Sequence, residues 1–155
     1  MRMNLLFLLS SDNMGGAEEV MRQIFEYFRE RECNIHVFFL LERRYGNWDG
    51  LASSNVHLHY SKGGGKLGIF SVLKNFWSVH NSRFDYSFSS IVLCTALIGL
   101  MKRLGVLHIN HVVGRESTLI FNRFKGLQLY LKKINYNIGY PSVDLLICQT
   151  QLMKD

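Results

Sequence analysis

The chain has 155 residues and a formal net charge of +6, and 48% of its residues are hydrophobic while 19% are charged. This length suits one domain, and this composition excludes a disordered or low-complexity chain. The positive charge favours anionic partners, namely phosphates, nucleic acid or an acidic membrane surface.

The first element expected is a short apolar strand over residues 3–9. This run is too short for the apolar core of a signal peptide, and no small-residue cleavage site follows it. The apolar run over residues 91–101 is too short to span a bilayer. The sequence therefore predicts neither a signal peptide nor a transmembrane segment.

The strand is followed by the segment SSDNMGG, which places Gly15 and Gly16 side by side before a helical pattern. Glycine lets a ligand come close to the backbone, and the free N–H groups at a helix start attract phosphate. A turn that requires a positive φ angle explains the pair equally well, so both interpretations stay open here. The dinucleotide fingerprint GxGxxG is absent.

A helix is expected from Ala17 onward, because apolar residues recur there at helical spacing. Asp12 or Asn13 is expected to cap its start, and Asn34 is expected to close it. A second apolar strand over residues 35–41 follows.

The remaining elements alternate between strands and helices. Strands are expected over residues 56–60, 84–88, 106–113 and 143–148, and helices over 67–80, 91–104 and 118–140, with the start of another helix from 149. The inner face of the helix at 67–80 is expected to hold Leu67, Phe70, Leu73, Phe76 and Trp77.

This alternation predicts an α/β fold, a Rossmann-like three-layer sandwich with a mostly parallel sheet, in a single domain over residues 1–155. Ligands bind such sheets beyond the carboxyl ends of the strands. Gly15 and Gly16 are expected at that edge.

The three cysteines, Cys33, Cys94 and Cys148, lie far apart and show no metal-ligand spacing. Each has apolar neighbours, which favours reduced, buried thiols in a cytosolic protein. No metal site is expected.

Four segments resemble the N-terminal domain of GT-B glycosyltransferases of the retaining family 4. The segments are GGAEEVMRQIFEYFRERECNIHVFFL, RFDYSFSS, INHVVGRES and YPSVDLLICQTQLMKD. Each motif is weak alone, but the four occur in the family's order and span nearly the whole chain.

The resemblance implies transfer of a sugar from a nucleotide-sugar donor to a saccharide or lipid-linked acceptor in polysaccharide synthesis. Transfer would retain the anomeric configuration and need no metal or other cofactor. It implies that the N–H groups of Gly15 and Gly16 stabilise the charge on the donor diphosphate. The family's donor-binding C-terminal domain is absent, so this acceptor-side half is expected to be inactive alone, either as an excised domain or as a subunit of a split enzyme.

The fifth strand supplies the other candidate site residues, because Gly114-Arg115-Glu116-Ser117 is expected just past its end. Arg115 could clamp a phosphate of donor or acceptor, and Glu116 could orient Arg115 or bind a sugar hydroxyl. These two form the expected catalytic pair, and a helix-capping box is the alternative. His111 is either an acceptor contact in the cleft or a packed core residue.

The last helix is basic, with Arg123, Lys125, Lys132 and Lys133 among apolar residues. Such a helix can lie on an anionic bilayer or simply expose a solvated basic face. The expected location is cytoplasmic, with a peripheral position on the inner face of the membrane as an option.

Two other function classes stay open. One is another Rossmann-type nucleotide-binding enzyme, such as a dehydrogenase or methyltransferase, and the other is a non-enzymatic membrane-recruiting or partner subunit of a split glycosyltransferase. Nucleic acid is not an expected partner, because the basic residues are dispersed and most aromatic residues follow core periodicity.

Overall fold

The computed structural model describes residues 2–62, 66–116 and 125–148. In this part of the chain six strands form one sheet in the order β3-β2-β1-β4-β5-β6, and every neighbouring pair is parallel. The strands are β1 (Asn4–Leu9), β2 (Asn34–Phe39), β3 (Val56–Tyr60), β4 (Arg83–Ser90), β5 (His108–Glu116) and β6 (Leu145–Cys148). This is the strand order of a doubly wound Rossmann fold.

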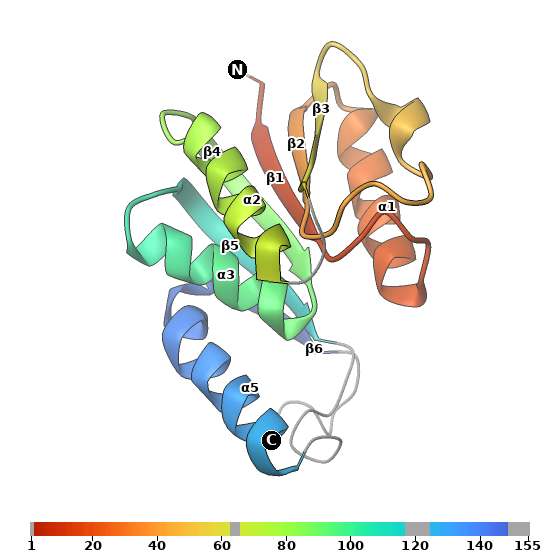
Figure 1. The fold of residues 1–155 in the computed structure, drawn as a ribbon. Coiled ribbons are helices and arrows are strands. Elements are labelled where there is room, and N and C mark those ends of the chain that lie inside the picture. Colours follow the sequence, from red (N-terminus) through yellow and green to blue (C-terminus); the bar gives the residue numbers. More distant parts are fainter. Residues whose placement is uncertain (1, 63–65, 117–124, 149–155) are drawn as a thin grey trace.

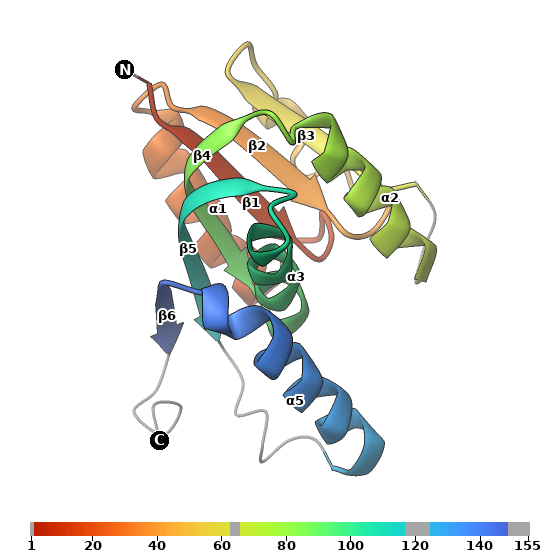
Figure 2. The same ribbon diagram turned by 90° about the vertical axis from the view of Figure 1, so that its left-hand side faces the viewer.

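Helices cover both faces of the sheet (Figures 1 and 2). Helix α1 (Gly16–Arg29) lies on one face, and α2 (Lys66–Ser78), α3 (Val92–Arg103) and α5 (Gly126–Gly139) lie on the other. Two short 3₁₀ turns, η1 (Asp49–Leu51) and η2 (Tyr140–Ser142), complete the described elements. The predicted three-layer, Rossmann-like α/β architecture is confirmed.

The central strand β1 explains why two cores form. Its residues Leu5 to Leu9 are all fully buried. Leu6 and Leu8 join the core under α2 and α3, whereas Leu5, Phe7 and Leu9 join the core under α1. A continuous apolar run is required here, because side chains of a strand covered on both faces alternate between two cores.

The predicted inner face of α2 is wrong at two positions. Phe70 is 72% exposed and Trp77 is 63% exposed. Phe76 is fully buried and Leu73 packs against the core, as predicted, and the buried face also includes Val72. The helix offers two overlapping apolar stripes at helical spacing, and packing against the sheet selects the one that includes Val72.

Two predicted boundaries are also wrong. Helix α1 ends at Arg29, and Asn34 is the first residue of β2. The left-handed position after the helix belongs to Glu32, with φ +53°. Strand β5 extends to Glu116, so Arg115 and Glu116 belong to the sheet and do not follow it.

Candidate functional site

The carboxyl ends of β1 and β4 mark the point where the fold reverses direction. From β1 the chain continues into α1 on one face, and from β4 it continues into α3 on the other. The loops therefore diverge at this edge, and open α/β sheets bind ligands at such a point.

Gly15 and Gly16 lie at this edge, as predicted. Gly15 is the N-cap of α1 with φ −84°, and no side chain caps the helix. Neither residue is among the described glycines with positive φ. The interpretation of the pair as a turn that requires a positive φ angle is therefore wrong. A Cβ atom on Gly16 would meet no atom within 4 Å, which leaves its backbone open to a ligand.

Glu18 occupies part of the space beside the glycine pair. A Cβ atom on Gly15 would lie 2.8 Å from Glu18 Oε2, and Ser10 Oγ donates a hydrogen bond of 2.9 Å to Glu18 Oε1. The positive end of the α1 dipole stabilises the Glu18 carboxylate. Burial raises the pKa of the Cys94 thiol on α3, and the nearby charge of Glu18 raises it further.

The predicted capping role of Asp12 is wrong. Its fully buried carboxylate accepts hydrogen bonds from the backbone N–H groups of Arg44, Tyr45 and Gly46 at 2.8–3.3 Å. Burial alone would raise the pKa of Asp12, but these three donors outweigh it and lower the pKa. Asp12 therefore fixes the loop after β2 against the loop after β1. No periodicity in the sequence indicates this contact.

Arg115 is the penultimate residue of β5 and is only 5% exposed. Its neighbour Val113 belongs to the core under α1, so strand alternation places the Arg115 side chain on the α1 face. Glu116 points to the opposite face. Arg115 therefore shares both the edge and the face of the Gly15–Gly16 turn, but Glu116 does not orient it.

Glu116 joins a buried cluster with α5 and η2 that the sequence analysis missed. The Tyr140 hydroxyl donates a hydrogen bond to Glu116, and the Tyr136 and Tyr140 rings stack with centroids 3.9 Å apart. Burial raises the pKa of Glu116, while Tyr140 and the charge of Lys132 lower it in part. Burial also raises the pKa values of both tyrosines. The sequence signal that could have indicated this cluster is the i, i+4, i+8 spacing of Lys132, Tyr136 and Tyr140.

His111 lies apart from these groups. It is in the middle of β5, exposed, and its ring stacks on Tyr86 at 5.1 Å between centroids. Four residues of strand separate it from Arg115, about 13 Å along the sheet. It is not a packed core residue, and the structure does not bring it to the carboxyl edge.

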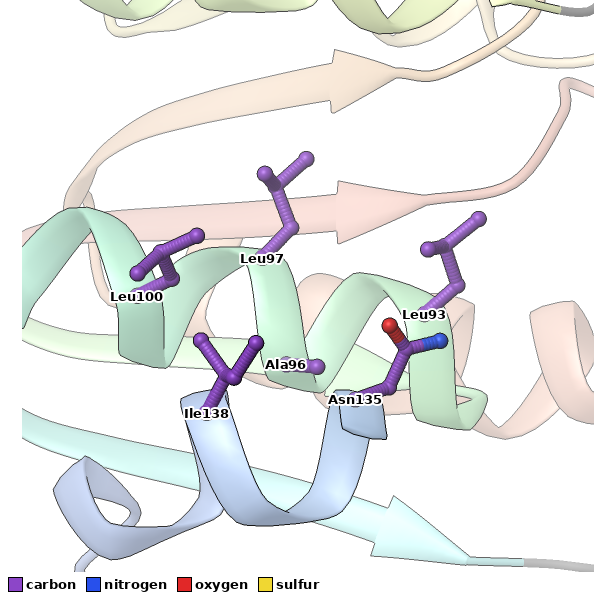
Figure 3. A pocket seen from close by; sticks show the side chains of 6 residues that line it. All are labelled: Leu93, Ala96, Leu97, Leu100, Asn135 and Ile138. Carbon is purple, nitrogen blue, oxygen red and sulfur yellow. The ribbon is translucent and has the colours of Figure 1, made fainter. Parts of the chain in front are cut away.

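A small pocket lies between α3 and α5 (Figure 3), and neither Gly15 nor Gly16 lines it. Its volume is about 100 Å³, and its lining is apolar except for Asn135. Ligand pockets for drug-sized molecules span roughly 300–1,000 Å³ and place several polar groups. This pocket therefore does not fit a nucleotide.

The described residues contain no group of three or more His, Cys, Asp or Glu side chains arranged to hold a metal ion. Cys33, Cys94 and Cys148 form no disulfide bond; the first two are buried and Cys148 is partly exposed. None of the helices in the described ranges has the length and apolarity needed to cross a membrane.

Two solved structures are similar to this chain over almost its whole length. They are crystal structures of Anabaena Alr3699/HepE in complex with UDP and in complex with UDP and glucose. Their TM-scores are 0.66 and 0.67, and both are 18% identical to this chain. The matches cover 98% and 99% of this chain but 39% and 40% of those structures.

At this identity the likeness establishes the Rossmann-like fold alone. The chain spans about two fifths of the length of the structures it matches. No protein-family model and no curated protein matches the sequence.

Proposed function

We propose that this chain is the acceptor-side half of a glycosyltransferase that moves a sugar from a nucleotide-sugar donor to a saccharide or lipid-linked acceptor. One observation carries the proposal. The open Gly16 backbone lies on the sheet edge of a fold whose neighbours were crystallised with UDP and glucose, the components of a nucleotide-sugar. The sequence motifs support the same function independently.

In this proposal the N–H groups at the start of α1 stabilise negative charge on the donor diphosphate. Gly15 and Gly16 allow the diphosphate to approach, because neither has a side chain. Arg115 contributes a buried positive charge on the same face for a phosphate of the donor or of the acceptor. Glu116 acts from the other face, where the Tyr140 hydroxyl donates a hydrogen bond to its carboxyl group. The exposed His111 contacts the acceptor.

The proposal extends to the stereochemistry and to the source of the donor contacts. Retention at the anomeric carbon is supported by the resemblance of the motifs to retaining enzymes. Most donor contacts would come from a second domain, which agrees with the two-fifths coverage of the similar structures. We therefore expect little or no sugar transfer by this chain alone, and no requirement for a metal or cofactor.

The test is a calorimetric titration of this chain with UDP, UDP-glucose, NAD and S-adenosylmethionine. We expect binding of the two uridine nucleotides and none of the other two ligands. Gly16→Val should weaken UDP binding at least tenfold while the chain still folds, because a side chain meets no atom there in the free protein. Gly50→Val is the matched control, since a Cβ at Gly50 also meets nothing within 4 Å.

Binding of NAD or S-adenosylmethionine in preference to UDP would support another Rossmann-type enzyme and reject the proposal. Unchanged UDP binding by Gly16→Val would remove the glycine turn from the site. Sugar transfer by the isolated chain at enzymatic rates would contradict the assignment of a half-enzyme.

We also propose a peripheral contact with an anionic membrane on the cytoplasmic side, made by the start of α5. Leu127, Tyr130 and Leu131 are 73%, 61% and 53% exposed and lie at i, i+3, i+4 spacing. Lys125 and Lys133 are exposed beside them. This half of α5 extends beyond the rest of the described fold (Figure 2). Exposed apolar groups with flanking lysines are typical of helices that lie in the bilayer interface.

A further inference from the structure

Two buried polar groups without partners lie next to each other at the carboxyl edge of the sheet. Arg115 is 5% exposed and Ser90 is 1% exposed. Arg115 Nη1 and Ser90 Oγ are both enclosed, and neither has a hydrogen-bond partner. Buried polar groups are almost always satisfied, so two orphans at one place call for an explanation.

The sheet register places the two side chains together. Ser90 on β4 pairs with Arg115 on β5. Each lies two residues beyond a member of the core under α1, Phe88 on β4 and Val113 on β5. Side chains paired across parallel strands project to the same face, so both groups face the α1 side of the sheet.

The charge of Arg115 makes its position costly. Among the described residues no carboxylate lies within 4.0 Å of its guanidinium. A buried unpaired charge is strongly unfavourable, whereas a guanidinium paired with an oxyanion forms short, charge-assisted hydrogen bonds. An arginine in such a place is explained if a negatively charged ligand completes it.

The backbone that holds Ser90 is itself constrained. Ile91, the next residue, has φ +84°, which is rare for a β-branched residue, and its N–H donates to the Arg115 carbonyl at 3.4 Å. This bond ties the turn after β4 to the end of β5. The backbone of Ser90 therefore has a defined position beside that of Arg115.

From this juxtaposition we propose that Ser90 and Arg115 form a subsite for an oxyanion, a phosphate or a carboxylate, with the hydroxyl and Nη1 donating to it. Ser90 lies on β4 and Arg115 on β5, about 5 and 10 Å from β1, which leads into the glycine turn. We assign the subsite to an anionic group of the acceptor and not to the donor diphosphate at α1. That identity, though not the subsite, rests on the proposed function.

The first experiment measures thermal unfolding of the chain with and without 50 mM inorganic phosphate at matched ionic strength. We expect phosphate to raise the midpoint of the wild-type chain by about 3 °C, as for a dissociation constant of about 10 mM. Ser90→Ala should reduce this shift and Arg115→Met should abolish it. Without phosphate, Arg115→Met should raise the midpoint, because the unpaired charge is gone.

Two controls match these variants. Ser87→Ala removes another buried, unpartnered hydroxyl of β4, but from the α3 side of the strand, and should keep the full phosphate shift. Arg83→Gln removes a positive charge at the opposite end of β4, where the side chain is exposed, and should also keep it.

The outcomes separate the subsite from the proposed function. An absent phosphate shift in the wild type, or a full shift in Arg115→Met, rejects the subsite. If Arg115→Met lowers the midpoint without phosphate, the arginine is structural and the proposal fails. With UDP present, an additive phosphate shift assigns the subsite to the acceptor, and loss of the shift assigns it to the donor. Loss of UDP binding alone would reject only the proposed function.

Discussion

Asp12 shows how one buried carboxylate organises the candidate site. It receives three backbone N–H groups from the loop after β2, and its own carbonyl accepts a hydrogen bond from Asn47 Nδ2 at 3.1 Å. Concave groups of N–H donors are the usual way in which a backbone binds an anion. Here the anion is the Asp12 side chain of the protein itself. Asp12 therefore sets the conformation of the loop after β2, which lies beside the carboxyl ends of the strands.

We predict that Asp12→Asn lowers the free energy of unfolding by about 1–3 kcal/mol at pH 7, because charge-assisted bonds to a buried carboxylate are replaced by weaker ones. The pKa of Asp12 is below its ordinary value of 3.8 in the folded chain. Its contribution is therefore complete above about pH 4 and is lost as the pH falls through the lowered pKa.

Urea unfolding of both proteins from pH 7 to pH 2 measures this difference. The gap between wild type and Asp12→Asn should narrow below pH 4. Glu30→Gln, which removes an exposed carboxylate, serves as the control and should differ from the wild type by less than about 0.5 kcal/mol. A constant gap over the whole pH range would contradict the role given to Asp12.

At the scale of elements, the backbones of α3 and α5 come into direct contact at Gly99 and Gly139. A Cβ atom on Gly99 would lie 2.0 Å from the Gly139 carbonyl oxygen, and one on Gly139 would lie 2.2 Å from the Ala96 carbonyl oxygen. This close packing brings the end of α5 onto the sheet. Tyr140 follows directly and reaches Glu116 on β5.

We predict that Gly139→Ala destabilises the fold by about 1–3 kcal/mol, because the two helices must separate. The separation should also move Tyr140 away from Glu116. The pKa of Glu116 should then rise further, because burial raises it and the hydrogen bond from Tyr140 lowers it. Chemical denaturation measures the first effect, and NMR titration of the Glu116 carboxyl group measures the second. Gly50→Ala, at an open position, should change neither quantity, and a fully stable Gly139→Ala chain would refute the packing argument.

For the whole molecule, the distribution of exposed apolar groups determines which surface can meet a membrane. We predict that the chain floats with vesicles that contain phosphatidylglycerol and not with pure phosphatidylcholine vesicles. Leu127→Ser combined with Leu131→Ser should reduce flotation at least fivefold, because both side chains would insert.

Leu104→Ser is the matched control for that experiment. Leu104 is 62% exposed but lies at the C-terminal end of α3, at the opposite edge of the sheet. Its loss should leave flotation unchanged. If the double variant at Leu127 and Leu131 floats as well as the wild type, an anionic membrane is no longer a proposed partner.

The sequence by itself determined the order of strands and helices, the parallel sheet and the position of Gly15 and Gly16. These follow from local patterns, since continuous apolar runs specify buried strands and helical spacing specifies amphipathic helices. Even so, the sequence misassigns the inner face of α2 at Phe70 and Trp77, because the helix offers two overlapping apolar stripes and the pattern alone does not select one.

Only the tertiary structure decided which groups meet at the candidate site. The contacts of Asp12 with Arg44, of Glu116 with Tyr140 and of Ser90 with Arg115 join residues distant in sequence. They depend on strand register and on how closely the helices approach the sheet, and neither quantity leaves a periodic trace in the sequence. A one-residue change of register would turn each strand side chain to the other face, so these contacts exist only in the assembled fold.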